Sequence, residues 1–154
     1  MAERISVNIK YHDNAVKIEE IEVGDWYDLA LPNEVKFEPF EFKLVPLNIS
    51  MELPEGYEAL IVPRSSTYKK WRLLQTNHMG VIDNSYNGDG DIWHLPLLHI
   101  PHKGVWDTKE ESVVVPKGTR LCQFRLMKQS ERIDFVEKDS LGNDNRGGFG
   151  STGS

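Results

Sequence analysis

The chain has 154 residues, enough for one domain with a buried core but too few for two domains of ordinary size. Its net charge of -6 excludes a broadly basic nucleic-acid-binding surface, although a few local Arg and Lys residues suffice for a small anionic ligand. There is no apolar run of membrane-spanning length, the first residues are polar, and Cys122 is the only cysteine, so no internal disulfide can form. We therefore expect a cytoplasmic protein in which Cys122 is a small buried residue.

Most of the chain carries the pattern of short β-strands separated by turn sequences. In residues 47–53, apolar residues alternate with Asn, Ser and Glu in a clean period of two. The only helix expected runs from about Ser66 to Trp71, with Ser65 or Ser66 as its N-cap. Strands are expected, in chain order, over residues 40–44, 47–53, 59–62, 92–100, 113–115 and 122–126. This many short strands predicts an all-β sandwich, jelly roll or barrel.

Between two of the expected strands, residues 99–111 are polar and are predicted to form a surface loop that carries Trp106. His94, His99 and His102 have a spacing that fits no compact set of metal ligands. We therefore expect these histidines on strands or at the surface.

The segment Pro63-Arg64-Ser65-Ser66 follows a buried strand and precedes the expected helix. An arginine, two hydroxyls and the N–H groups of a helix start together suit an anion such as a phosphate. A capped helix beginning with an incidental arginine explains the same segment, so the segment alone leaves both interpretations open.

Asp83 lies just after the apolar pair Val81-Ile82. A carboxylate held at the edge of an apolar wall can accept a proton from water and direct that water at an electrophile. Tyr86, three residues later, is close enough to pack against the group that is attacked. The alternative is an Asx turn in which Asp83 binds the backbone of Ser85 or Tyr86 and has no other role.

Residues 141–154 hold five of the twelve glycines of the chain and cannot form a folded core. The order Arg146-Gly-Gly-Phe149-Gly-Ser151-Thr152 suits a mobile arm that closes on an anionic, planar ligand. Arg146, Ser151 and Thr152 can donate hydrogen bonds, and Phe149 can stack. A Gly/Ser linker is the alternative interpretation.

Taken together, these segments resemble the trimeric dUTP diphosphatases (dUTPases), and most closely the short versions carried by Gram-positive bacteria and their phages. That family has five ordered motifs, and together they cover nearly the whole chain. Their recognisable forms here are Asp25-Trp-Tyr-Asp28-Leu29, Pro63-Arg-Ser-Ser66, Gly80-Val-Ile-Asp-Asn-Ser-Tyr-Asn-Gly88, Gly118-Thr-Arg-Leu-Cys-Gln-Phe124 and Arg146-Gly-Gly-Phe-Gly-Ser-Thr-Gly153.

The resemblance implies an enzyme that hydrolyses dUTP to dUMP and pyrophosphate, which keeps uracil out of DNA and supplies dUMP for dTMP synthesis. It implies that Asp83 orients the water that attacks the α-phosphorus. It further implies that Tyr86 packs under the deoxyribose and excludes a 2′-hydroxyl, and that the hairpin carrying Asn77 and Gly80 reads uracil.

For the phosphates, the resemblance implies contacts from Arg64, Ser65, Ser66 and Gln123. The expected cofactor is Mg²⁺, which rides mainly on the triphosphate and which Asp28 reaches through water.

The resemblance also implies a homotrimer with shared active sites. Each chain is expected to be a distorted jelly-roll β-barrel with one short helix over residues 1–138. Residues 139–154 are expected to form a flexible arm that closes over a neighbouring subunit's site, with Phe149 on the uracil. Arg146 stands three residues before Phe149, whereas the common fifth motif has its Arg five residues before the Phe, where this chain has Asp144.

Two alternatives remain. A dCTP deaminase shares the expected fold, but such enzymes need a Glu in the strand after the third motif, and residues 91–97 contain none. Some phage dUTPases bind other proteins and act as switches, so the loop over residues 99–111 is a candidate contact for a regulatory partner, in the bacterial host cytoplasm if the protein is phage-encoded.

Overall fold

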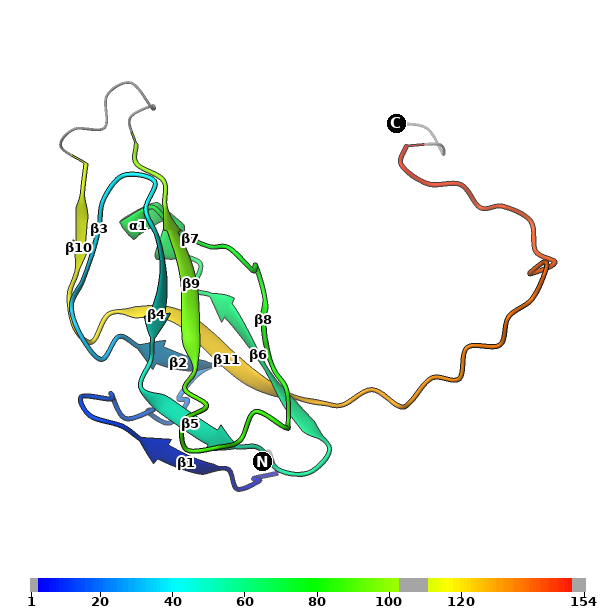
Figure 1. Ribbon diagram of the computed structural model, residues 1–154, viewed down its shortest axis with the longest axis horizontal. Coiled ribbons are helices and arrows are strands. Elements are labelled where there is room, and N and C mark those ends of the chain that lie inside the picture. Colours follow the sequence, from blue (N-terminus) through cyan, green and yellow to red (C-terminus); the bar gives the residue numbers. More distant parts are fainter. Residues whose placement is uncertain (1–2, 103–110, 151–154) are drawn as a thin grey trace.

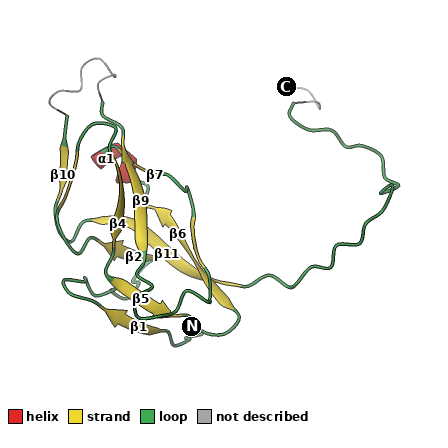
Figure 2. Cartoon of the chain, in the orientation of Figure 1, coloured by secondary structure: helices red, strands yellow, loops and turns green. Residues whose placement is uncertain are grey.

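The computed structural model of the chain describes residues 3–102 and 111–150. Short strands form a body with one short helix, and a C-terminal segment extends away from it (Figures 1 and 2). In chain order the elements are β1 (Asn8–Tyr11), β2 (Tyr27–Ala30), β3 (Val35–Phe37), β4 (Phe42–Pro46), β5 (Ile49–Glu52), β6 (Tyr57–Pro63), α1 (Thr67–Trp71), β7 (Leu73–Gln75), β8 (Gly80–Ile82), β9 (His94–His99), β10 (Val113–Val115) and β11 (Arg120–Lys128). The all-β class with one short helix is therefore confirmed.

The strands form four antiparallel sheets. One has the order β2-β11-β6-β8, another the order β4-β9-β7, and β1-β5 and β3-β10 are two-stranded. Within the described ranges, backbone pairing does not join these sheets into one continuous closed barrel. Strands far apart in sequence are neighbours, since β11 near the end of the body lies between β2 and β6. This arrangement brings residues from four of the five sequence segments to one sheet.

The core is apolar and aromatic. Trp93 and Phe37 are its largest fully buried side chains, and Trp93 meets Phe124 edge-on with ring centroids 5.3 Å apart. Cys122 is buried in the same core, as predicted, and burial raises the pKa of its thiol so that it stays protonated. It therefore acts as a small apolar residue.

Residues 47–53 keep the predicted alternation only in part. All four apolar residues of the segment are buried. However, Asn48 has φ 57°, which separates β4 from β5, so the segment is not one strand. Ser50 is also buried, and its hydroxyl does not lack partners. It donates to Asp89 O at 3.0 Å and lies 2.9 Å from His12 Nε2. The pattern identified the inward apolar positions but not the break.

The outward face of the β4-β9-β7 sheet is also apolar. Phe42 and Leu44 are 55% and 58% exposed, whereas Val45, the next residue along β4, is buried. Phe42 stands opposite Leu98, and Leu44 stands opposite Pro96. An exposed apolar face of this kind in one chain indicates a contact surface.

The predicted helix and the histidines are found close to their expected places. α1 begins after Ser66, which occupies the N-cap but makes no side-chain cap hydrogen bond. Instead, the buried Thr67 Oγ1 donates to Leu121 O at 2.6 Å and ties the helix to β11. His94 and His99 lie on β9, and His99 is buried, so the expected loop starts only after this residue. Residues 103–110 of that loop, with Trp106, lie outside the described residues.

Candidate active site

Two of the predicted phosphate-site residues and the residue predicted to reach the metal lie together where β2, β11 and β6 adjoin. Gln123 on β11 stands opposite Asp28 on β2, and Arg64 follows the end of β6. Arg64 Nε lies 3.2 Å from Asp28 Oδ1, and Gln123 Nε2 donates to Pro63 O at 3.4 Å. Sheet pairing thus brings together residues that are about one hundred positions apart in the chain.

Arg120 is a further member of this group, which the sequence analysis did not single out. Its Nη1 lies 3.5 Å from Asp28 Oδ2, and its Nη2 lies 2.6 Å from Glu19. The hydrogen bond and charge of Glu19 raise the pKa of Arg120. A hollow of about 380 Å³ opens beside Asp28 and Arg120. The sequence signal for Arg120 was its position inside the Gly118–Phe124 segment. Its partners Glu19 and Asp28 lie about one hundred residues earlier in the chain.

Ser65 and Ser66 are exposed in the turn between β6 and α1. The turn is held on both sides, since Arg64 N donates to Leu121 O and Thr67 N donates to Arg64 O. Both hydroxyls therefore lie next to Arg64 on a fixed backbone, as an anion site requires.

A second group of predicted residues lines a cavity of about 300 Å³. Asn77, Gly80 and Tyr86 are among its lining residues, with Ile61 and Trp93 from the body. A Cβ added to Gly80 would lie 3.3 Å from Ile61 Cβ and 3.3 Å from Asn77 Nδ2. A side chain at residue 80 would therefore crowd the wall of the cavity, which explains why glycine suits this position.

Asp83 stands in the turn that follows β8. Its Oδ1 accepts hydrogen bonds from Ser85 N at 2.8 Å and from Ser85 Oγ at 2.5 Å. These bonds lower the pKa of the exposed Asp83 carboxyl, the hydroxyl contributing most. The Asx turn that the sequence left open is therefore present. It occupies Oδ1 only, and no hydrogen bond to Oδ2 occurs among the described residues.

Asn84 anchors that turn to the body, a role that sequence reasoning missed. Its Nδ2 donates to Pro54 O and Tyr57 O, each at 2.9 Å. Tyr86 is held as well, because its hydroxyl donates to Ile92 O at 2.9 Å. The carboxylate and the tyrosine ring are therefore positioned relative to the cavity by long-range contacts.

The two groups lie at opposite ends of β6. Ala59 pairs with Ile82, so Asp83 lies level with Glu58, whereas Arg64 follows the far end of the strand. Six residues of extended chain correspond to about 20 Å at ~3.3 Å per residue. The structure thus brings Asp83 together with Asn77, Gly80 and Tyr86, but it does not bring Asp83 to Arg64 within one chain.

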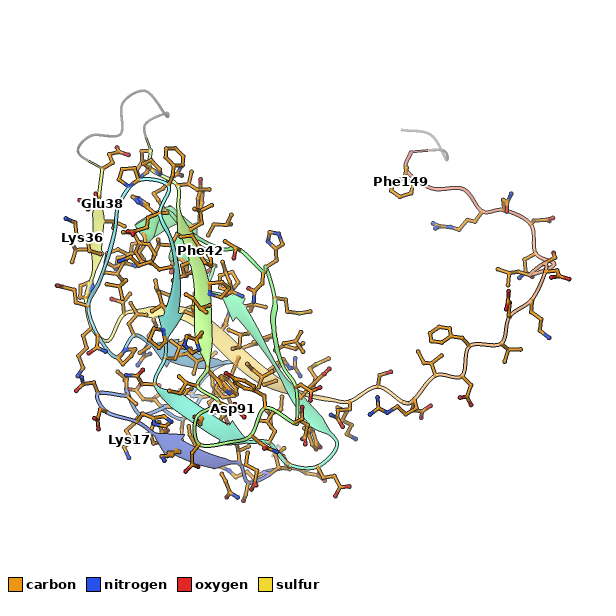
Figure 3. All side chains as sticks on the ribbon, viewed as in Figure 1. Lys17, Lys36, Glu38, Phe42, Asp91 and Phe149 are labelled. Carbon is orange, nitrogen blue, oxygen red and sulfur yellow. The ribbon has the colours of Figure 1, made fainter. Side chains whose placement is uncertain are left out.

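The C-terminal segment beyond Arg132 lies apart from both groups, whereas the charge of Arg132 still helps to lower the pKa of Asp83. All residues from 129 to 150 are exposed, including Arg146 and Phe149, and Phe149 stands far from the body in Figure 3. Apolar side chains along this segment, among them Ile133 and Phe135, are exposed too. Ser151 and Thr152 lie outside the described residues.

The residues present can be compared with the expected metal. The described part of the chain contains no group of three or more His, Cys, Asp or Glu side chains that is able to hold a metal ion. Both oxygens of Asp28 already lie near arginines. A cation beside Asp28 would therefore be held through water and would require an anion, such as a phosphate, to draw at least one arginine away. Among the same residues, no helix is long and apolar enough to cross a membrane.

Comparison with known proteins gives a consistent result. The dUTPase family model matches residues 22–153. The SPbeta prophage-derived deoxyuridine 5′-triphosphate nucleotidohydrolase YosS of Bacillus subtilis (strain 168) is 51% identical over 150 residues, covering 97% of this chain and 99% of that protein. A deoxyuridine 5′-triphosphate nucleotidohydrolase of Finegoldia magna is 36% identical over 79% of this chain and 78% of that protein.

Among solved structures, the dUTPase of Staphylococcus bacteriophage 80alpha with dUPNHPP superposes with a TM-score of 0.76 at 23% identity. The match covers 97% of this chain and 99% of that one. This likeness confirms the predicted jelly-roll type of fold.

Proposed function

The chain belongs to the dUTPase family, and we propose that it hydrolyses dUTP to dUMP and pyrophosphate. One observation carries the proposal: the Asp83 turn is fixed beside a cavity lined by Asn77, Gly80 and Tyr86, the residues expected to bind uracil and deoxyribose. The reaction would keep uracil out of DNA and supply dUMP for dTMP synthesis.

In the proposed mechanism, Asp83 orients and deprotonates the attacking water. Ser85 keeps the carboxylate ionised and occupies Oδ1, so Oδ2 is the oxygen that accepts the water's proton. The cavity holds the base, and the anchored Tyr86 ring lies under the sugar, where it leaves no room for a 2′-hydroxyl. Catalysis then rests on the position of the water and on charge neutralisation.

The phosphates bind to the second set of residues, those around Arg64. Arg64, Ser65, Ser66 and Gln123 contact the phosphate oxygens, and Arg64 exchanges its partner Asp28 for them. Asp28, which stays close to Arg120, would then contact through water a Mg²⁺ bound to the triphosphate. The metal would supply further neutralisation of the phosphate charge.

We further propose that the protein is a homotrimer with shared sites. The α-phosphorus attacked at Asp83 and the oxygens bound by Arg64 belong to one short triphosphate, whereas the two groups are about 20 Å apart in one chain. A neighbouring chain must therefore supply one group. The apolar outer face of the β4-β9-β7 sheet supports a contact between chains. Leu44 and Pro96 of that face also line the base cavity, so the contact would lie next to the site.

Residues 1–138 would then form the body and residues 139–154 an arm that reaches a neighbour's site. Phe149 would stack on uracil, while Arg146, Ser151 and Thr152 would bind phosphate oxygens. The exposed apolar side chains of the segment support this proposal, because they need a surface to cover them. The nucleotide substrate and the single buried cysteine favour the cytoplasm as the location.

The change Phe42→Asp tests the assembly. We expect it to place a charge in the interface, to convert the trimer to monomers, and to abolish most of the dUTP hydrolysis. Sedimentation and the rate of pyrophosphate release measure the two effects. Val114→Asp changes an equally apolar, exposed residue on β10 and should leave a trimer with normal activity. A trimeric, active Phe42→Asp variant would refute the proposed interface.

Pyrophosphate release from dUTP with Mg²⁺, in parallel with dCTP, dTTP and UTP, tests the function itself. Release from dUTP alone, lost on addition of EDTA, is the expected result. Ammonia from dCTP would instead indicate the deaminase, and no reaction with dUTP in a folded trimer would refute the proposal.

A regulatory role is a second candidate. Phage dUTPases such as that of Staphylococcus bacteriophage 80alpha control transfer of virulence genes. In this chain the candidate contact, the loop over residues 99–111, falls largely outside the described residues, so that role stays a prediction.

A further inference from the structure

Gln75 is a buried polar residue on β7 to which neither the sequence motifs nor the proposed mechanism assigns a role. Its side chain is 2% exposed and lines the 300 Å³ cavity together with Asn77 and Gly80. Burial of an amide is costly unless its hydrogen bonds are made, so its contacts indicate what it does.

The orientation of the Gln75 amide follows from backbone oxygens. Nε2 donates to Ile61 O at 3.1 Å and lies 3.5 Å from His78 O. The two carbonyls can only accept, so the NH₂ end of Gln75 must face them. The other end, Oε1, is buried with no hydrogen-bond partner among the described residues.

The orientation of Gln75 determines that of Asn77. The same Nε2 donates to Asn77 Oδ1 at 2.9 Å, so the oxygen of the Asn77 amide is turned toward Gln75. Its Nδ2 therefore lies on the other side, 3.3 Å from the position of a Cβ on Gly80. Asn77 is thus held with a donor as its free polar end.

A fixed N–H donor distinguishes uracil from cytosine, because the two bases differ in one exocyclic group. It suits a carbonyl oxygen, which uracil carries where cytosine carries an amine. A freely rotating Asn amide can turn over and accept from the amine instead. We infer that Gln75 is a specificity-determining positioning residue, which holds Asn77 in the orientation that favours uracil over cytosine. The inference rests on the proposed function of the same cavity.

Gln75→Met tests it, because methionine has nearly the same shape but no donor. Removing the unpartnered Oε1 as well offsets part of the lost hydrogen bonding, so the variant should fold. We expect the ratio of kcat/KM for dUTP to that for dCTP to fall about 10-fold or more, mainly through KM. The ratio of dUTP to dTTP, which differ by a methyl group, should change little.

Two control variants isolate the effect. Leu73→Met alters the neighbouring inward position of β7 outside the cavity, and Gln129→Met makes the same chemical change at an exposed site. Both should keep the wild-type ratio. Gln75→Leu removes both polar ends of the amide and so also leaves Asn77 free to turn over, and its ratio should fall about as far.

The outcomes are distinct. If the wild-type protein hydrolyses dUTP and folded Gln75→Met and Gln75→Leu both keep its dUTP-to-dCTP ratio, the role of Gln75 is refuted while the proposed function stands. If the wild-type protein does not hydrolyse dUTP, the proposed function and this inference fail together.

Discussion

Replacement of Asp83 by Asn is expected to lower kcat for dUTP by about 10²–10⁴-fold, the usual contribution of a general base. The amide cannot take the proton of the attacking water. Its oxygen can still accept the two hydrogen bonds from Ser85, so the turn and the neighbouring cavity should be preserved. Binding of a non-hydrolysable dUTP analogue, measured by calorimetry, should therefore change little, while the rate of pyrophosphate release collapses.

The matched control is Asp89→Asn. Asp89 lies just after the same segment, but its carboxylate is exposed and, among the described residues, pairs only with Lys10 at 3.1 Å. An exposed pair of this kind contributes about 0–1 kcal/mol, so Asp89→Asn should keep nearly normal turnover. Near-normal turnover in Asp83→Asn would remove this carboxylate as the base. A loss of analogue binding would instead show that the change had damaged the cavity.

Truncation after Ser140 should leave the trimer intact but reduce dUTP hydrolysis by about 10²-fold, comparable to the loss of one donor to a developing charge. The deleted residues include Arg146 and Phe149, which make no contact with the body of their own chain, so the fold should not depend on them. Without the arm, the site stays open to water and loses the stacking on the base. Sedimentation and steady-state kinetics provide the two measurements.

A mixing experiment tests whether the arm acts on a neighbouring chain. Truncated chains retain Asp83, and Asp83→Asn chains retain the arm. Trimers refolded from both should therefore regain part of the activity that each variant lacks alone. Normal activity of the truncated protein would exclude the arm from the site, and a mixture no more active than its components would exclude sharing between chains.

Local sequence pattern pointed to residues in both parts of the site. Asp83 and Tyr86 were predicted because they follow an apolar pair at short spacing, whereas Gly80 and Asn77 were predicted from the family resemblance alone. Arg64 and its two serines were also predicted from local pattern, as a polar turn after a buried strand. The resemblance of the chain to the dUTPase family was confirmed by the family model and by the relatives that match.

Other features depended on contacts that no local pattern contains. The β4 segment had the period of a strand, yet Phe42 and Leu44 face outward, because period two does not state which face meets the core. The roles of Arg120 and Asn84 arise from partners that sheet pairing brings from distant parts of the chain.

The sequence by itself thus determined the all-β class, the short helix and the buried Cys122, and it predicted the main site residues, because strand period, turn chemistry and motifs can be read along the chain. Only the tertiary structure decided that Asp83 and Arg64 lie at opposite ends of β6, and that Gln75 orients Asn77. The physical reason is that register and burial are set by long-range pairing, so the partners of a side chain appear only when the strands have come together.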